Sequence, residues 1–109
     1  MATLTPATAA RSANPITFTG ASPGGDEFAN TGKELLLVRH TNAGGVGLTL
    51  TVTSQATVDG LAVEDRTVVI DPGETHVLGP WPKGAYNDAN GNVALSWSAT
   101  TDIEVAVIA

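Results

Sequence analysis

Residues 47–55, GLTLTVTSQ, alternate apolar and hydroxyl-bearing side chains, and this pattern restricts the segment to a pleated conformation. Side chains of a β-strand point to opposite faces in turn, so Leu48, Leu50 and Val52 share one face and the intervening threonines share the other. β-branched residues pack well on such a pleat and are poor helix formers. The segment is therefore predicted to be a strand with one buried face.

Short segments of the same kind follow along the rest of the chain, separated by glycine, proline and asparagine, and no window keeps a helical period for three turns. The segment 33–40, KELLLVRH, is apolar on successive residues and is predicted to be a central strand covered on both faces, with a subunit-contact face at Leu35–Val38 as the alternative. Further strands are expected within residues 15–19, 25–30, 61–70, 74–81, 92–99 and 102–109.

About eight short strands with turn signals between them predict an all-β fold, an antiparallel sandwich of two sheets. A jelly roll fits eight strands best, and an immunoglobulin-like sandwich is the alternative. A chain of 109 residues has room for one domain, which is expected to span 15–109. Residues 1–14, MATLTPATAARSAN, are small and polar without a period, so they are expected to form a flexible N-terminal arm.

Composition excludes several classes of function. There is no cysteine, which removes disulfides and thiolate metal sites. Five basic and eleven acidic residues give a formal charge of −6, so a nucleic-acid partner is not expected. The N-terminus lacks the pattern of a secretion signal, and no apolar run approaches the roughly eighteen residues of a membrane helix. We expect a protein made in the cytoplasm without a membrane partner.

The stretch 79–97, GPWPKGAYNDANGNVALSW, allows both a metal loop and a hairpin. Asp88, Asn90 and Asn92 have the spacing of the first three ligands of a calcium loop, but Val93 stands where that loop needs glycine and its closing glutamate is missing. Asn90-Gly91 is a preferred pair for a two-residue hairpin turn. A hairpin is therefore predicted, and no metal site.

The aromatic residues of this stretch have two interpretations. Trp97 alternates in phase with Val93 and Leu95, which predicts a core position. Trp81 lies between two prolines and is predicted to pack in the core or to cap the end of the sandwich. A contact of Trp81 and Tyr86 with a protein or a carbohydrate is the alternative.

Catalytic patterns find no support in the sequence. His40 and His76 fall on different predicted strands without a metal-binding spacing. No serine lies in a nucleophile elbow. Glu64 and Asp65 are neighbours on a strand and point to opposite faces, so they cannot flank one bond. The chain is predicted not to be an enzyme and to need no cofactor.

Several linked motifs resemble a known family. They are TVDGLAVEDRTV from Thr57 to Val68, PGE from Pro72 to Glu74, GPWP from Gly79 to Pro82, and YNDANGNV from Tyr86 to Val93. An upstream match lies in GDEFANTGKELLLVRHTNAG, residues 25–44. These motifs resemble the small all-β virion proteins of tailed bacteriophages that are encoded close to the major capsid protein. The resemblance covers roughly residues 15–109.

The resemblance implies assembly rather than a reaction. Such proteins are commonly capsid decoration (cement) proteins, which bind the major capsid protein on the outside of the virion, often as trimers. A tail, baseplate or head-fibre component and a carbohydrate-binding module for host attachment are the alternatives. The residues expected to bind a partner are Leu4, Pro6 and Arg11 in the arm and Trp81, Lys83 and Tyr86 in the turn-rich stretch.

Overall fold

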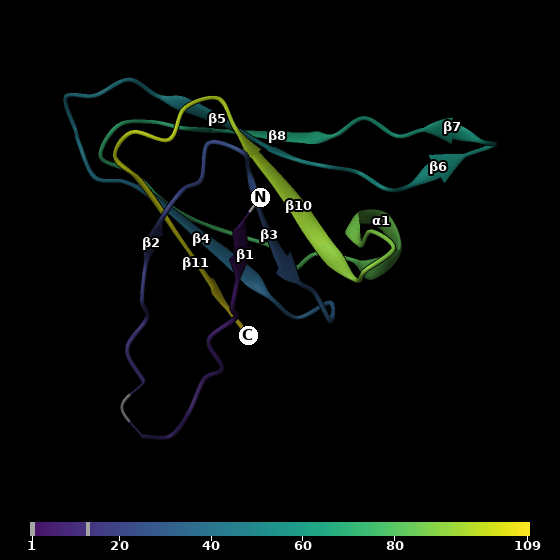
Figure 1. Cartoon of the computed structure of the whole chain (residues 1–109), viewed down its shortest axis with the longest axis horizontal. Coiled ribbons are helices and arrows are strands. Elements are labelled where there is room, and N and C mark those ends of the chain that lie inside the picture. The colour runs from purple at the N-terminus through teal and green to yellow at the C-terminus, as the bar shows by residue number, and fades with distance from the viewer. Residues whose placement is uncertain (1, 13) are drawn as a thin grey trace.

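The computed structural model describes residues 2–12 and 14–109 and consists of two β-sheets, a separate β-ribbon and one helical turn (Figure 1). The larger sheet has the strand order β1-β3-β10-β5-β8, the smaller sheet has the order β2-β11-β4-β9, and β6 pairs with β7. The elements are β1 (Ala2–Leu4), β2 (Thr19–Gly20), β3 (Asp26–Ala29), β4 (Leu35–His40), β5 (Leu48–Val52), β6 (Thr57–Val58), β7 (Leu61–Ala62), β8 (Arg66–Ile70), β9 (Thr75–Leu78), α1 (Lys83–Tyr86), β10 (Asn92–Trp97) and β11 (Ile103–Ile108). The all-β prediction is confirmed, whereas the number of about eight strands is wrong: the described residues form eleven strands in three sheets.

Strand pairing is nested along the chain. The strand β5 pairs with β8, β4 with β9, β3 with β10 and β2 with β11, all antiparallel. The chain therefore pairs like one long hairpin that has been rolled up, and the pairs β10·β5 and β11·β4 close the roll. Among the described strands only β1 and β3 pair in parallel, so the prediction of antiparallel sheets is confirmed with that one exception.

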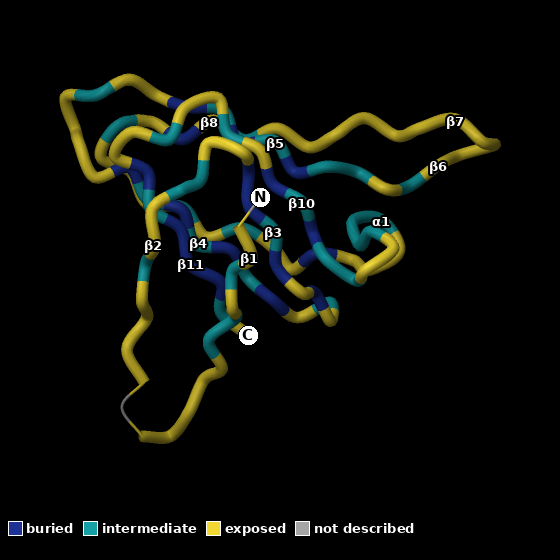
Figure 2. Tube along the Cα trace, in the orientation of Figure 1, coloured by how far each residue is buried: buried dark blue, intermediate teal, exposed yellow. Residues whose placement is uncertain are grey.

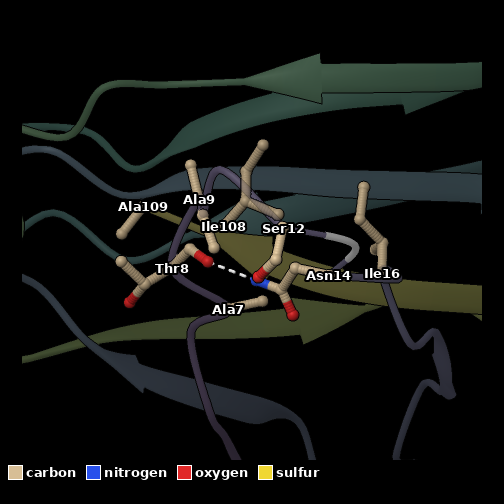
Figure 3. A pocket seen from close by; sticks show the side chains of 9 residues that line it. Ala7, Thr8, Ala9, Ser12, Asn14, Ile16, Ile108 and Ala109 are labelled. Carbon is tan, nitrogen blue, oxygen red and sulfur yellow. Dashed lines mark hydrogen bonds between the residues drawn. The ribbon is translucent and has the colours of Figure 1, made fainter.

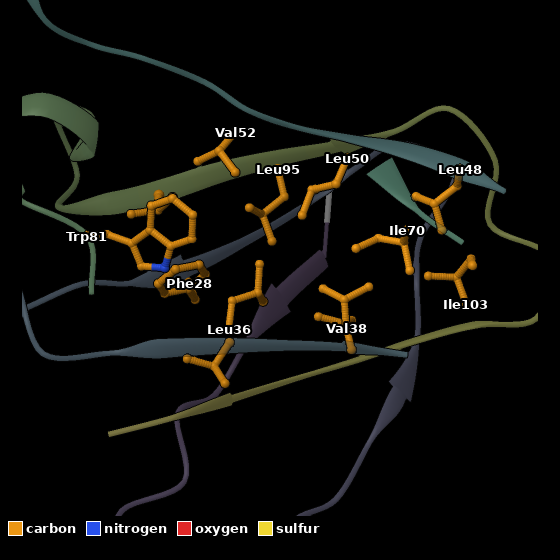
Figure 4. Close-up of a cluster of buried hydrophobic side chains, with 13 residues drawn as sticks. Phe28, Leu36, Val38, Leu48, Leu50, Val52, Ile70, Trp81, Leu95 and Ile103 are labelled. Atoms are coloured by element: carbon orange, nitrogen blue, oxygen red, sulfur yellow. The ribbon is translucent and has the colours of Figure 1, made fainter. Parts of the chain in front are cut away.

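The core lies between the two sheets (Figure 4). Leu48, Leu50 and Val52 are buried while Thr49 and Thr51 are half-buried, which confirms the alternation expected for this strand. Side chains from both sheets meet them to form one apolar cluster. Its members are Phe28, Leu36, Val38, Leu48, Leu50, Val52, Ile70, Trp81, Val93, Leu95, Ile103, Val105 and Val107.

The predicted central strand is confirmed, because β4 lies between β11 and β9. Leu36 and Val38 point into the core and are buried. The residues of the opposite face are half-buried rather than fully covered. Phe18 provides part of that cover, because the Arg39 guanidinium carbon lies 3.9 Å from the centroid of the Phe18 ring. Arg39 Nη2 also forms an ion pair with Glu104 Oε1 at 2.6 Å. A cation above an aromatic face is a favourable contact.

The N-terminal segment differs from the flexible arm expected for residues 1–14. Residues 2–4 form β1 at the edge of β3. Further along, the Ala7 N–H donates to Val107 at 2.8 Å, and the Ala109 N–H donates to Ala7 at 2.8 Å. An extended backbone can complete a sheet edge whatever its side chains are, so composition alone does not reveal this pairing. Met1 and Ala13 lie outside the described residues.

The strand expected at 15–19 is also shorter than predicted, because only Thr19–Gly20 pairs, with β11. Every described residue of 8–17 is exposed (Figure 2). This segment is called the arm loop below.

The turn before β10 does not have the geometry expected from Asn90-Gly91. Gly91 has φ +78°, but Asn90 is not in the left-handed region. The Gly91 N–H donates to the Asp88 carbonyl at 3.0 Å, and Asp88 Oδ1 accepts from the N–H groups of Asn90 at 2.8 Å and Asn92 at 3.1 Å. Asp88 therefore opens a four-residue turn that Gly91 closes, and its carboxylate caps the loop.

Glu34 is a buried carboxylate that holds the turn before β4. Its Oε1 accepts from the Thr31 N–H at 2.8 Å, the Thr31 hydroxyl at 2.9 Å and the Lys33 N–H at 3.2 Å. Burial by itself raises the pKa of this carboxyl, but the hydrogen bonds from Thr31 and Lys33 outweigh burial. The pKa of Glu34 therefore lies below its ordinary value of 4.5.

This shift predicts the pH dependence of a Glu34→Gln variant. A carboxyl whose pKa is lower in the folded state stabilises the fold above its unfolded pKa, and that contribution is lost as the pH falls through the folded value. We expect Glu34→Gln to lower the melting temperature at pH 7 and to approach the wild type below about pH 4.5. Thermal unfolding followed by circular dichroism from pH 7 to 3 measures this. A difference that is constant with pH would contradict it.

Candidate functional site

The six residues expected to bind a partner lie in two separate places. Leu4, Pro6 and Arg11 belong to the N-terminal segment, whereas Trp81, Lys83 and Tyr86 lie in the loop and helical turn after β9. Figure 1 shows α1 and the arm loop on different sides of the sandwich. The structure does not bring the two groups together into one site.

In the N-terminal group, exposure rises along the segment. Leu4 pairs with Phe28 and is half-buried, Pro6 is half-buried, and Arg11 is exposed on the arm loop. The arm loop and the end of β11 enclose a shallow groove of about 380 Å³ (Figure 3). Its lining has no charged side chain and comprises Ala7, Thr8, Ala9, Ala10, Ser12, Asn14, Ile16, Ile108 and Ala109. Asn14 Nδ2 donates to the Thr8 carbonyl across it.

In the second group, Trp81 is a core residue with 3% of its surface exposed (Figure 4). Tyr86 stands edge-on to it, with ring centroids 5.3 Å apart and planes at 82°. Tyr86 is half-buried and Lys83 is exposed. The core or end-cap position predicted for Trp81 is confirmed. A carbohydrate platform needs both rings exposed side by side, and the burial of Trp81 rules out that arrangement in this loop.

The side-chain amides of Asn30, which is buried, and Asn87, which is half-buried, fasten this loop to the end of β3. Asn30 Nδ2 donates to the Trp81 carbonyl at 2.9 Å and to Asn87 Oδ1 at 2.7 Å, and Asn87 Nδ2 donates back to the Asn30 carbonyl at 3.0 Å. This pairing fixes the loop, because a broken bond leaves the buried Asn30 amide without a partner. The loop therefore presents a preformed surface.

A groove lies beside this loop, where the outer edges of β8 and β9 face each other. It measures about 420 Å³ and is called the Trp81 groove. Its lining comprises Arg66, Val68, Val77, Leu78, Gly79, Pro80, Trp81, Pro82 and Tyr86, none of them acidic. Arg66 Nε donates to the Tyr86 hydroxyl at 3.1 Å, and this bond raises the pKa of Arg66. Most side chains that line the groove are apolar, and the Arg66 guanidinium adds a positive charge.

A third groove, of about 490 Å³, runs between β1 and β2. Asp26, which is fully buried, contributes to its lining together with several threonines. Asp26 Oδ2 accepts from the Ser22 N–H at 3.0 Å and from Trp97 Nε1 at 2.8 Å, while Oδ1 has no hydrogen-bond partner.

The two histidines have local structural partners. The backbone N–H of Asn42 donates to His40 Nδ1 at 3.2 Å, and His40 Nε2 lies 2.8 Å from the Val46 carbonyl. His76 Nε2 lies 3.0 Å from Glu74 Oε1, and this hydrogen bond lowers the pKa of Glu74. Within residues 2–12 and 14–109, no three metal-ligating side chains gather. The side chains of the two predicted carboxylate neighbours, Glu64 and Asp65, are exposed.

The exposure of the apolar side chains in the β6–β7 ribbon was not predicted from the sequence. Val58 and Leu61, which are 65% and 73% exposed, flank a turn at Asp59-Gly60 with φ values of +52° and +78°. A two-residue hairpin turn needs both of its residues in the left-handed region, and Asp-Gly is a pair that favours this geometry. The sequence signal was therefore Asp-Gly between alternating apolar residues. Residues 56–63 are called the hairpin tip below.

Comparison with known proteins gives no match to this chain among family models, curated proteins or solved structures. In the described part of the chain, no helix has the length and apolar character to cross a membrane.

Proposed function

We propose that this chain is a structural protein of a tailed-bacteriophage virion, a capsid decoration protein that binds and stabilises the lattice of the major capsid protein. The proposal rests on the resemblance of residues 56–99 to such proteins. The structural observation that supports it is a flat two-sheet block with two exposed projections, the arm loop and the hairpin tip.

The proposal includes a jelly-roll fold. Jelly rolls are two-sheet folds of eight strands built from two Greek keys. Without β1, β6 and β7, eight strands are left in the two sheets, in the orders β2-β11-β4-β9 and β3-β10-β5-β8. Their four nested pairs support this assignment over the immunoglobulin-like alternative, because every strand of the first half pairs with its counterpart in the second half.

The shape of the molecule supports a covering role. Its extents are 43 × 37 × 20 Å. Figure 1 is viewed down the shortest axis, and both projections extend sideways within that view. A flat block that reaches sideways can span neighbouring subunits of a shell, and many weak identical contacts on a symmetric lattice add up to firm attachment.

Charge supports the outside of a filled head as the location, because a formal charge of −6 disfavours contact with DNA. The proposed partners are the major capsid protein and further copies of the chain, with a trimer favoured, and the proposed role includes no reaction and no cofactor. Of the predicted binding residues, Arg11, Lys83 and Tyr86 have surface available for a partner, whereas Trp81 acts by supporting the loop.

The proposal predicts that the purified chain binds undecorated heads of the phage that encodes it. We expect retention on heads in a co-sedimentation assay and a higher temperature of head disruption when the chain is present. The matched control is a set of heads already carrying their full complement of decoration protein. Absence of binding at micromolar concentration would reject the proposal.

A tail, baseplate or head-fibre position is the second candidate, and the exposed projections suit such a position equally. Electron microscopy of particles carrying a labelled chain separates the two, since decoration predicts label over the whole head surface. Label confined to the tail would favour the second candidate.

A further inference from the structure

The hairpin tip is an isolated ribbon with one apolar face. Thr57 pairs with Ala62 and Val58 with Leu61, and the Val63 N–H donates to the Ala56 carbonyl at 3.0 Å. Because side chains alternate between faces along a strand, Val58, Leu61 and Val63 lie on the same face. Figure 2 shows the ribbon projecting from the body with its tip exposed.

This arrangement is unfavourable for a ribbon that stays in water. A two-stranded hairpin alone is marginally stable, and contiguous exposed apolar side chains commonly mark a surface that another molecule covers. The ribbon is also acidic, because residues 56–65 contain Asp59, Glu64 and Asp65 and no basic residue. An occupant must therefore offer an apolar surface next to positive charge.

The Trp81 groove has both properties. Val77, which is 61% exposed, and the two prolines of the GPWP motif supply apolar surface. Arg66 lies in the lining, and Lys83, which is exposed, follows Pro82 directly. The groove is preformed by the Asn30 and Asn87 bonds, so docking needs little ordering of the loop.

Within one molecule the base of the ribbon, Ala56 and Val63, lines a pocket together with Arg66 and Tyr86, whereas β6 and β7 extend away from the body (Figure 1). Two hairpin tips meeting each other would bring the Asp59 carboxylates of the two copies together, and like charges in contact are repulsive. Charge and apolar surface therefore favour contact between the tip of one copy and the groove of another over contact between two tips.

We propose that the hairpin tip of one copy docks in the Trp81 groove of a second copy, with Val58 and Leu61 against Val77 and the prolines, and with Asp59 near Arg66 and Lys83. A contact between two different patches closes into a ring or a reciprocal pair when the rotation permits. The contact concerns the chain alone and does not depend on binding to a capsid.

Sedimentation velocity of the purified chain over a concentration series tests the contact. We expect the wild type to associate and the double variant Val58→Thr/Leu61→Thr to associate at least about tenfold more weakly, since two buried apolar contacts are lost. The matched control is Val46→Thr, because Val46 is 85% exposed and lies outside both surfaces. A wild type that stays monomeric, or a double variant that associates like the wild type, would overturn the proposal.

Site-directed cross-linking identifies which surfaces meet, and the chain suits it because it contains no cysteine. Leu61→Cys and Val77→Cys are made in separate proteins, mixed and oxidised. We expect the mixed disulfide to exceed both homodimers, with Val46→Cys as the background control. A Leu61→Cys homodimer as the main product would show that tips pair with tips and would overturn the proposal. Neither result bears on head binding, so failure here is distinguishable from failure of the proposed function.

Discussion

Replacing Trp81 by alanine is expected to lower the free energy of unfolding by about 3–5 kcal/mol. The indole is buried in the core beside Tyr86, so its removal leaves a cavity and abolishes the edge-to-face contact between the two rings. A domain of this size has a total stability of only about 5–15 kcal/mol, so the variant loses a large fraction of it. Urea unfolding followed by circular dichroism measures the change.

Two further variants separate the packing role of Trp81 from a contact role. Trp81→Phe keeps much of the volume and is expected to lose less stability than Trp81→Ala. Val46→Ala removes an exposed side chain and is expected to change stability by less than about 0.5 kcal/mol. If Trp81→Ala unfolds at the same urea concentration as the wild type, the core position of Trp81 is wrong.

Gly79→Ala is expected to cost about 1–3 kcal/mol for backbone conformation alone. Gly79 has φ +122°, which side chains rarely adopt. A Cβ at this position would also lie 3.0 Å from the Glu34 carbonyl oxygen, 3.0 Å from Trp81 Nε1 and 3.2 Å from Leu35 Cδ2. The carbonyl belongs to the backbone, so the contact cannot be relieved by a side-chain rotation.

Gly84→Ala is the matched control, because no atom lies within 4 Å of a Cβ built there and the residue belongs to α1. Alanine is the better helix former by about 1 kcal/mol, so this variant is expected to be neutral or slightly stabilised. The two variants are compared by melting temperature and by near-ultraviolet circular dichroism of the tryptophans. Equal melting temperatures would contradict the close approach described for Gly79.

The sequence predicts best those features that depend on alternation. Leu48, Leu50, Val52, Val93 and Leu95 are buried as expected, whereas Trp97, predicted to be a core residue, is half-buried and packs against the edge of the core. Alternation works here because one face of each strand meets the opposite sheet, and burial of that face is a large, uniform driving force.

Features that depend on main-chain pairing or on a single turn residue were harder to predict. The pairing of residues 2–4 with β3 uses backbone groups that every sequence carries. The Asp88 turn and the Asp59-Gly60 turn have similar sequence signals, yet only the second has two left-handed residues. The Asp88 carboxylate makes the difference, because it satisfies two backbone N–H groups and stabilises a four-residue turn.

The candidate site was predicted only in part for a related reason. The sequence does not distinguish an apolar side chain that is exposed, as in the ribbon, from one that is buried, as at Trp81. Burial depends on which residues the tertiary fold places opposite each side chain. Asn30 and Asn87 hold the loop through contacts with residues far away along the chain, so no local pattern reveals them.

The nested pairing has a consequence for how the chain acquires its structure. The inner pair β5·β8 closes a short connection, whereas Thr19 and Val105 of the outer pair β2·β11 are 86 residues apart. Closing long connections is entropically expensive, and topologies dominated by distant pairs reach the native state slowly. Because β11 lies between β2 and β4, β2 lacks its partner strand and β4 keeps one open edge until residue 108 has been made. A shortened or partly synthesised chain therefore exposes open strand edges that invite aggregation.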